Sequence, residues 1–185
     1  LIQLSALGNA IDFFKGFDEI LIDAQKRPRF AIDDIRLVEK KLKSSIRKVL
    51  FLADNAGESF FDHPLVEKIR EYCEVVYVVK ASPVQNDITL EDLRIAGLKG
   101  VMGRVITTGT DAVGVDFSTA SDEFKKEFEE ADLILAKGMG YYETLPELPV
   151  KEKIFYLLKA KCRPVADNLG VSVGSYVALL HNVSD

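Results

Sequence analysis

From residue 48 onward, short apolar runs alternate with longer polar stretches of helical character. The apolar runs consist almost entirely of Val, Ile and Leu, as in strands that are buried on both faces. When such strands alternate with helices along a chain, they form a parallel sheet with helices packed on both sides. We therefore predict a three-layer, Rossmann-like α/β/α fold with a mostly parallel sheet. The runs expected to form strands are 48–54, 75–80, 103–109, 132–138 and 153–160.

Helix signals lie between these strands. Thr89 precedes the helical stretch 89–98, and Asp92 stands three residues later, in the position that completes a capping box. Another helix is expected over 63–73, with Pro64 in its first turn, where proline is tolerated. Each of these helices would connect two strands and cover one side of the sheet.

The first 47 residues have a different pattern. Between 32 and 46, apolar side chains recur near every 3.6 residues, and most charges lie on the opposite face. The opening residues look like the middle of a helix, so we expect that an upstream helical part has been removed. The sequence thus divides into a helical segment, 1–47, and an α/β domain, 48–185.

Composition narrows the classes of partner. The formal net charge is −5 and the pI is near 5.2, which argues against a surface that binds nucleic acid. No apolar run approaches the roughly 18 residues that span a bilayer, so we expect no membrane segment. Cys73 and Cys162 are far apart, which is typical of buried thiols in a cytoplasmic protein. A small anionic substrate is compatible with the acidic balance, because one bound cation inverts the local field.

Oxygen-bearing side chains follow two of the predicted strands. The segment 50–59, LFLADNAGES, places Asp54 and Asn55 directly after a buried strand, and the strand 75–80 runs on to Asp87. Open α/β sheets bind their ligands in the crevice outside the carboxyl ends of the strands. Two carboxylates and an amide that meet there form an oxygen-only site suited to Mg²⁺ or Mn²⁺. The alternative is a simple strand-ending turn, which Asp and Asn also favour.

Several other enzyme classes lack their signatures. A phosphatase of the haloacid dehalogenase type needs DxDx[TV] after its first strand, but Ala56 stands two residues after Asp54. The stretch ADNAGES has one glycine, whereas dinucleotide- and S-adenosylmethionine-binding domains need more. No GxxxxGK[ST] segment marks a P-loop, and the two histidines do not have the spacing of a zinc site.

Several short motifs, taken together, resemble the damage-control phosphatases, the family first catalogued as DUF89. The resemblance covers nearly the whole chain in the expected order, and it looks closest to subfamily I, the archaeal and bacterial branch. No single motif is specific, but their order makes the match strong. The motifs are GNAIDF at 8–13, DNAGE at 54–58, NDIT at 86–89, ADLILAKG at 131–138, GYYE at 140–143 and KAKCRPVADNLGVSVGSYV at 159–177.

This resemblance implies a divalent-metal-dependent phosphatase helped by Mn²⁺, Ni²⁺, Co²⁺ or Mg²⁺. Its substrates would be small phosphorylated metabolites, namely sugar phosphates, nucleotide-related compounds or cofactor fragments such as phosphopantetheine, as a role in metabolite damage control requires. By the same resemblance, the metal ligands would be Asp54, Asn55 and Asp87, and Lys137 would face the phosphate. The region 48–185 would be the metal-binding phosphatase domain.

The chain departs from the family pattern in two places. Subfamily I has a CxxC motif in an N-terminal helical region, and this chain has none, as the removal of an upstream part would explain. The family's Gly-Asn-Phe-Glu motif reads Gly-Tyr-Tyr-Glu, so Tyr141 replaces the usual Asn and its amide. We expect a substrate preference shifted accordingly. The residues expected to contact substrate are Asn9, Lys137, Gly138, Gly140, Tyr141 and Glu143.

Three side chains are candidates for the catalytic step. Lys137 ends a predicted strand, where an exposed ammonium would meet phosphoryl oxygens; the alternative is a solvated lysine. Glu58 lies about one turn after Asp54 and would orient or deprotonate the attacking water, or else it only interacts with the helix dipole. Asn9 and Asp12 share a helix face, where Asp12 would handle a proton; the alternative is a capping or surface pair.

A non-enzymatic function is the main alternative to a phosphatase. A module that binds a phosphorylated metabolite through a metal ion uses the same ligands as an enzyme that hydrolyses it. The motifs therefore favour hydrolysis only through the family resemblance, and turnover has to be measured.

Overall fold

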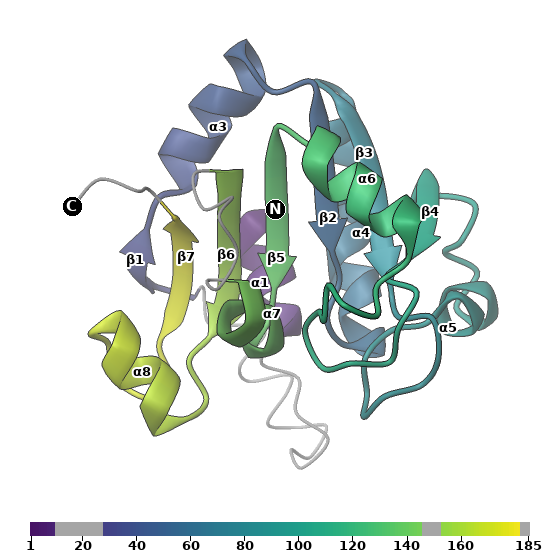
Figure 1. Ribbon diagram of the computed structural model, residues 1–185. Coiled ribbons are helices and arrows are strands. Elements are labelled where there is room, and N and C mark those ends of the chain that lie inside the picture. The colour runs from purple at the N-terminus through teal and green to yellow at the C-terminus, as the bar shows by residue number, and fades with distance from the viewer. Residues whose placement is uncertain (10–27, 146–152, 182–185) are drawn as a thin grey trace.

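A seven-stranded sheet forms the centre of the computed structural model, which describes residues 1–9, 28–145 and 153–181 (Figure 1). The strands lie in the order β1-β7-β6-β5-β2-β3-β4. All neighbouring pairs are parallel except β6 and β7, so β7 and β1 run against the other five strands. The strands are β1 (Phe30–Asp33), β2 (Lys48–Leu52), β3 (Glu74–Val79), β4 (Arg104–Thr107), β5 (Leu133–Lys137), β6 (Ile154–Lys159) and β7 (Tyr176–Leu180).

The order of the strands reverses beside β2. After β2, the chain adds β3 and β4 on one side, and it then returns to place β5 and β6 on the other side. The carboxyl ends of β2 and β5 therefore flank a topological switch point, where the connecting loops diverge and leave a crevice. The oxygen-bearing segment that follows β2 begins at this crevice.

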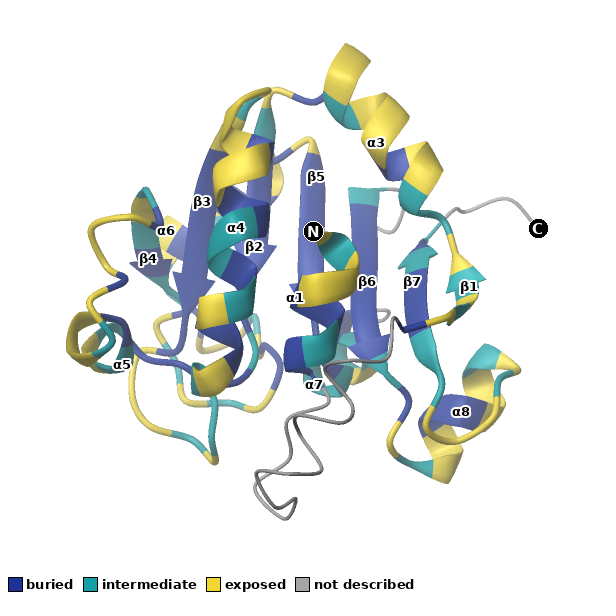
Figure 2. Cartoon of the chain, turned by 180° about the vertical axis from the view of Figure 1, so that it is seen from behind, coloured by how far each residue is buried: buried dark blue, intermediate teal, exposed yellow. Residues whose placement is uncertain are grey.

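Helices cover both sides of the sheet and complete the predicted three layers. The helices are α1 (Ile2–Gly8), α3 (Ile35–Ser44), η1 (Ala56–Glu58), α4 (Ser59–Arg70), α5 (Leu90–Ile95), α6 (Asp122–Glu130), α7 (Met139–Thr144) and α8 (Arg163–Leu169). α1, α3 and α4 lie in front of the sheet in Figure 2, and α6 lies on the opposite side (Figure 1). Alternate residues of β2 enter two separate apolar clusters, Val49 and Phe51 on one side and Leu50 and Leu52 on the other.

The structure corrects the prediction that residues 1–47 are all helical. Phe30–Asp33 forms β1, an edge strand that pairs with β7, and the amphipathic helix begins only at Ile35. Ile32 fits the helical spacing, but alternate side chains of β1 are half-buried and exposed, which is the period of a strand. Residues 10–27 lie outside the described part of the chain, so the domain boundary after residue 47 stays a prediction.

The predicted helix signals have different outcomes. Thr89 and Asp92 form the expected capping box, in which the Thr89 amide donates to Asp92 Oδ2 at 2.8 Å. The helix expected over 63–73 begins earlier, at Ser59, and Pro64 lies inside it. The first turn of α4 carries the buried side chains of Ser59 and Asp62. Their contacts with the rest of the protein stabilise helical structure at residues where the local sequence does not predict it.

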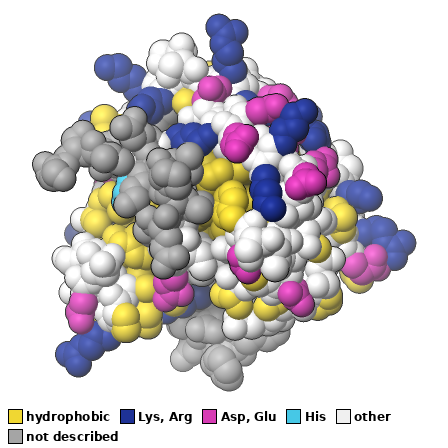
Figure 3. Space-filling model, viewed as in Figure 1, with side chains coloured by type: hydrophobic (Ala, Val, Ile, Leu, Met, Phe, Trp, Pro, Cys, Tyr) yellow, Lys and Arg dark blue, Asp and Glu magenta, His cyan; other side chains and the backbone are white. Residues whose placement is uncertain are grey.

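Surface features bear on the classes of partner. The face shown in Figure 3 has acidic and basic side chains close together. Among the ion pairs of the structure, Nζ of Lys48 lies 2.6 Å from Glu127 and 2.8 Å from Glu130. Cys73 and Cys162 are free thiols, but both are half-buried rather than buried as predicted. Within the described ranges, no helix combines the length and apolar character that crossing a membrane demands.

Candidate functional site

Asp54, Asn55 and Asp87 are brought together by a short backbone pairing beyond the end of β2. The carbonyl oxygen of Asp54 accepts a hydrogen bond from the amide of Ile88 at 2.8 Å, and Asn55 faces Asp87 in an isolated antiparallel bridge. On the other side of this bridge, the amide of Ala56 donates a second backbone hydrogen bond of 2.9 Å to the carbonyl oxygen of Asn86. The three candidate ligands therefore share one edge of the sheet, while their role as metal ligands stays a prediction.

The carboxylate of Asp54 lies against the turn that follows β5. Gly138 has a φ of +82°, and a Cβ at this position would overlap the Asp54 carboxylate, so only glycine fits. From other directions, Nδ2 of Asn9 donates to Asp54 Oδ2 at 2.8 Å, and Nδ2 of Asn55 donates to the same oxygen at 3.0 Å. The carboxylate is thus fixed between the ends of β2, β5 and α1.

Glu58 is a buried member of the same cluster. It is 1% exposed, and its Oε1 accepts hydrogen bonds from the amide groups of Asn9, at 2.9 Å, and Asn55. Its Oε2 lies 2.6 Å from Nζ of Lys137. These contacts favour a function in the site over a simple interaction with the helix dipole.

Asn9 joins the first helix to the site. It is the C-cap residue of α1 and is 1% exposed, so Asn9 itself is neither an N-cap nor a surface residue. Its Oδ1 accepts a hydrogen bond of 3.0 Å from the amide of Lys159, at the end of β6. Asp12, the predicted proton acceptor, lies outside the described residues.

The prediction that Lys137 presents an exposed ammonium is wrong. Its side chain has no exposed surface, and Nζ lies 2.9 Å from the Ser5 carbonyl, 2.6 Å from Asp62 Oδ1 and 2.6 Å from Glu58. Burial alone would lower the pKa of Lys137, but Asp62 and Glu58 outweigh this effect and raise it. Two hydrogen bonds and the close ion pair with Glu58 enclose the ammonium, so it is not accessible to a phosphate.

Asp62 is a buried carboxyl that the sequence interpretation missed. It has no exposed surface, and it accepts hydrogen bonds from Ser5 Oγ at 2.6 Å and Tyr77 Oη at 3.1 Å. Burial raises the pKa of its carboxyl group. The available signal was an acidic residue four positions after Glu58, which places it on the same face of a helix.

Lys80 was also missed, although it ends the apolar run 75–80. It is 1% exposed, and its Nζ donates to the carbonyl oxygens of Ala112, at 2.9 Å, and Gly114. The same nitrogen lies 3.5 Å from Asp87 Oδ2. Lys80 therefore ties the loop after β4 to a candidate metal ligand, and its donors are occupied as fully as those of Lys137.

The residues of the GYYE motif lie on α7. Tyr141 is 1% exposed beneath the Lys80 ammonium, which lies 4.8 Å from its ring centre, and its hydroxyl has no hydrogen-bond partner within the described residues. Gly140 packs against Gly114 of the facing loop. Glu143 is exposed, and no ion pair or hydrogen bond within the described ranges joins its side chain to the cluster.

The buried charges of the cluster are unbalanced. Burial, Glu58 and Asp87 raise the pKa of Asp54 to about 8, and burial raises the pKa of Asp87. Four carboxyl groups, including Asp62, thus share the space with only the two ammonium groups of Lys80 and Lys137. An excess of carboxyl groups of this kind is compatible with a bound divalent cation, which stays a prediction.

The donor set fits a hard divalent cation. Asp54 and Asp87 supply carboxylate oxygens, and the two N–H groups of Asn55 are directed at carboxylates, which leaves its amide oxygen as a ligand. Across the described segments, no group of three or more His, Cys, Asp or Glu residues has the arrangement of a metal site. The predicted site differs from such a group because one of its three ligands is the amide of Asn55.

The raised pKa of Asp54 predicts how the stability of the metal-free protein changes with pH. A carboxyl that holds its proton more tightly when folded stabilises the protein at low pH, and this contribution is lost as pH rises through the folded-state pKa of about 8. Between pH 6 and pH 9 we expect the free energy of unfolding to fall by about 2 kcal/mol. Urea denaturation in EDTA measures this fall, and Asp54→Asn should largely abolish it. An equally steep fall in the variant would contradict the raised pKa.

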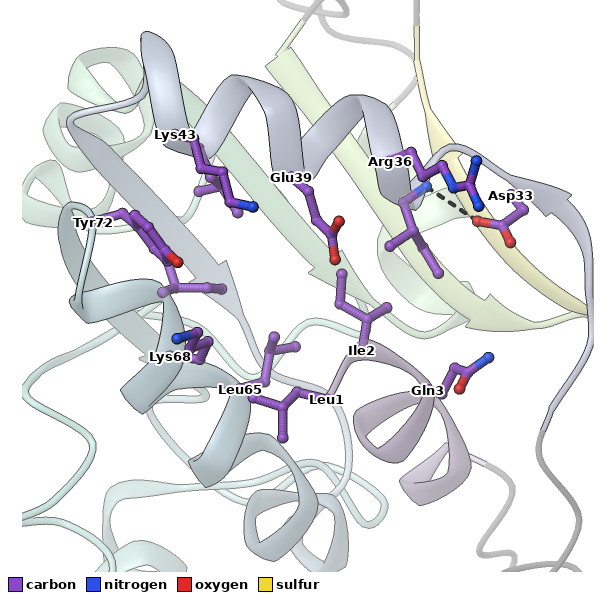
Figure 4. Close-up of a pocket in the computed structure, with 13 residues that line it drawn as sticks. Leu1, Ile2, Gln3, Asp33, Arg36, Glu39, Lys43, Leu65, Lys68 and Tyr72 are labelled. Carbon is purple, nitrogen blue, oxygen red and sulfur yellow. Dashed lines mark hydrogen bonds between the residues drawn. The ribbon is translucent and has the colours of Figure 1, made fainter.

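One surface groove formed by described residues lies away from this cluster. A groove of about 500 Å³ is bounded by the first turn of α1, by α3 and by the second half of α4, whereas the site adjoins the opposite ends of α1 and α4 (Figure 4). Aliphatic side chains such as Leu65 alternate there with both acidic and basic groups. This groove has no cluster of ligand oxygens comparable to that at Asp54.

Comparison with known sequences gives one family over most of the chain. The model of the damage-control phosphatase ARMT1-like domain matches residues 1–177. An uncharacterized protein of Methanocaldococcus jannaschii is 48% identical over 180 residues, which cover 93% of this chain and 59% of that protein. A damage-control phosphatase of Pyrococcus horikoshii is 42% identical over 184 residues, covering 96% and 63%. The chain therefore spans about three fifths of the length of these relatives.

Comparison with solved structures gives the same result. The crystal structure of a DUF89 family protein from Pyrococcus horikoshii matches with a TM-score of 0.86 and 41% sequence identity. The match covers 98% of this chain and 65% of that one. This chain therefore has a fold that is already known from a crystal structure.

Proposed function

The chain belongs to the damage-control phosphatase ARMT1-like family, and we propose that it hydrolyses phosphate monoesters of small metabolites with the help of a divalent cation. The observation that carries this proposal is the meeting of Asp54, Asn55 and Asp87 at the switch point of the sheet. Because the relatives are longer than this chain, their activity is transferred here only as a proposal.

In this proposal, Asp54, Asn55 and Asp87 hold the cation, which is Mn²⁺, Ni²⁺, Co²⁺ or Mg²⁺. When bound, the cation supplies the positive charge that phosphate hydrolysis needs and polarises a phosphoryl oxygen. The backbone pairing of 54–56 with 86–88 fixes the spacing of the ligands before any substrate arrives. Such preorganisation avoids rearrangement during the reaction.

Glu58 acts by positioning its neighbours. Its two oxygens are occupied by the amides of Asn9 and Asn55 and by the Lys137 ammonium, so neither oxygen is directed at an attacking water. Glu58 accepts one N–H of Asn55 and Asp54 accepts the other, and together they turn the amide oxygen of Asn55 toward the cation. Proton transfer from the attacking water is then assigned to Asp12, as the GNAIDF motif suggests.

The substrate side of the site is formed by the turn after β5 and the loop after β4. Gly138 and Gly140 allow backbone to come close to a phosphoryl group, and Tyr141 takes the place of the family's Asn. Asn9 and Glu143 complete the proposed contacts. The substrates proposed are sugar phosphates, nucleotide-related compounds and cofactor fragments, whose hydrolysis would remove damaged or surplus metabolites.

Turnover separates the enzyme from a non-catalytic binder. The protein is incubated with p-nitrophenyl phosphate and each of Mn²⁺, Co²⁺, Ni²⁺ and Mg²⁺, and release of p-nitrophenol is measured; a panel of phosphorylated metabolites follows. An enzyme releases phosphate only when a cation is present. A binder is stabilised against heat by a phosphorylated compound and its cation without releasing phosphate, and this result would replace the proposed function with the alternative.

A further inference from the structure

Each of the two candidate carboxylate ligands already has one oxygen engaged by the protein. Oδ2 of Asp54 accepts hydrogen bonds from Nδ2 of Asn9, at 2.8 Å, and Nδ2 of Asn55, at 3.0 Å. Oδ2 of Asp87 lies 3.5 Å from the ammonium of Lys80. A carboxylate whose Oδ2 is held in this way has its other oxygen, Oδ1, to offer to an ion.

The contact between Lys80 and Asp87 is fixed from several directions. Lys80 directly follows β3 and is 1% exposed, and its backbone amide donates at 2.8 Å to the carbonyl oxygen of Ile88, the residue after Asp87. Its ammonium also donates to the carbonyl oxygens of Ala112, at 2.9 Å, and Gly114. The ammonium therefore leaves Asp87 only if these hydrogen bonds to the loop after β4 are broken as well.

The third candidate ligand also offers a single oxygen. The N–H groups of Asn55 donate to Oδ2 of Asp54 and to Oε1 of Glu58, so its Oδ1 is the atom left for an ion. The three ligands thus supply one oxygen each, and the other positions around an ion fall to waters or phosphoryl oxygens. Small octahedral cations such as Mg²⁺ bind in this way and keep several waters. Ca²⁺ takes roughly six to eight oxygens, commonly with carboxylates that bind through both of theirs.

We propose that Lys80 is a positioning residue that determines which cations the site accepts. By engaging Oδ2 of Asp87, it restricts that carboxylate to one metal bond, and the site thereby selects small six-coordinate cations over Ca²⁺. This inference rests on the proposed function for the identity of the metal ligands. Lys80 itself contacts neither the ion nor the substrate. Its positive charge disfavours every divalent cation alike, so the selectivity arises from the number of oxygens that the ligands offer.

Binding of metal ions in the absence of substrate tests the proposal. MnCl₂ and CaCl₂ are titrated separately into the metal-free protein by calorimetry, and the ratio of the two affinities is compared between variants. We expect the wild type to bind Mn²⁺ at least about tenfold more tightly than Ca²⁺. In Lys80→Met, Oδ2 of Asp87 is free to bind a larger ion, and the ratio should fall to about twofold. Both ions carry two charges, so the loss of a lysine charge alone leaves the ratio unchanged.

Lys153 provides the matched control. Like Lys80, it uses its ammonium to hold backbone carbonyl oxygens, those of Phe128 at 2.8 Å, Glu129 at 2.9 Å and Ala131 at 3.0 Å. These acceptors lie at the end of α6 and beyond it, and none of them is a candidate metal ligand. Lys153→Met therefore removes a comparable side chain and should keep the affinity ratio of the wild type within about twofold.

A crystal structure of the wild type with Mn²⁺ tests the same point if Lys80→Met does not fold. We expect Oδ1 of Asp87 on the ion and Oδ2 still beside Lys80. Both oxygens on the ion, equal affinity of the wild type for Ca²⁺ and Mn²⁺, an unchanged ratio in Lys80→Met, or no binding of either ion would each overturn the proposal. If only the proposed function fails, the cations still bind with this selectivity, but no ester is hydrolysed. The two inferences therefore fail separately.

Discussion

Asp54→Ala and Asp87→Ala are each expected to lower metal-dependent phosphate release about a thousandfold or more. Each change removes one of the two carboxylates that hold the proposed cation, and the remaining carboxylate and the amide of Asn55 do not replace its charge. The measurement is kcat/KM with Mn²⁺ and p-nitrophenyl phosphate, together with Mn²⁺ affinity by calorimetry. Both quantities should fall together.

The control for these two variants is an aspartate outside the site. Asp167 is exposed on α8, and Asp167→Ala should retain full activity. Asp54→Ala should also fold at least as well as the wild type at pH 8 without metal, because it removes repulsion from Glu58 and Asp87. An Asp87→Ala variant with wild-type activity would contradict the proposed site, because Asp87 comes from a different loop than the other ligands.

Lys137→Ala is expected to reduce the free energy of unfolding by about 3–5 kcal/mol, the typical cost of breaking a buried ion pair. The ammonium is the common partner of Asp62 and Glu58, which are both within 2.6 Å of it and have almost no access to water. Its removal leaves two carboxyl groups without a buried counter-charge. Urea denaturation at pH 7 measures the change.

Two comparisons test the cause of this loss. Lys126→Ala removes a lysine whose side chain is 72% exposed and lies 3.8 Å from Glu130, and it should cost less than about 0.5 kcal/mol. The double variant Lys137→Met/Asp62→Asn should lose less free energy of unfolding than the two single variants lose in sum, because the two residues interact directly. A loss below about 1 kcal/mol for Lys137→Ala would show that the charge cluster does not support the fold.

The central strands could be predicted because a parallel sheet buried on both faces leaves continuous apolar runs in the sequence. Those runs also placed Asp54 and Asp87 correctly at the same sheet edge, since the carboxyl ends of parallel strands meet there. The edge strand β1 and its neighbour β7 were not predicted. β1 has only two half-buried apolar residues, Phe30 and Ile32, and Ile32 also fits the helical spacing of the residues that follow it.

The burial of charge could not be derived from local pattern. Lys137 and Lys80 each end an apolar strand, and a lysine in that position looks the same in the sequence whether it is solvated or enclosed. Its state is decided by residues remote in the chain, such as Asp62 on α4 and the carbonyl of Ala112. The two lysines therefore support the site from within.

A crystal grown with Mn²⁺ and measured for anomalous scattering tests the central claim most directly. We expect one strong peak at the switch point, about 2.2 Å from a carboxylate oxygen of Asp54, the amide oxygen of Asn55 and a carboxylate oxygen of Asp87. An ion held by Asp54 while Asp87 points away beyond bonding distance, or no ion at this edge of the sheet at saturating Mn²⁺, would contradict the account.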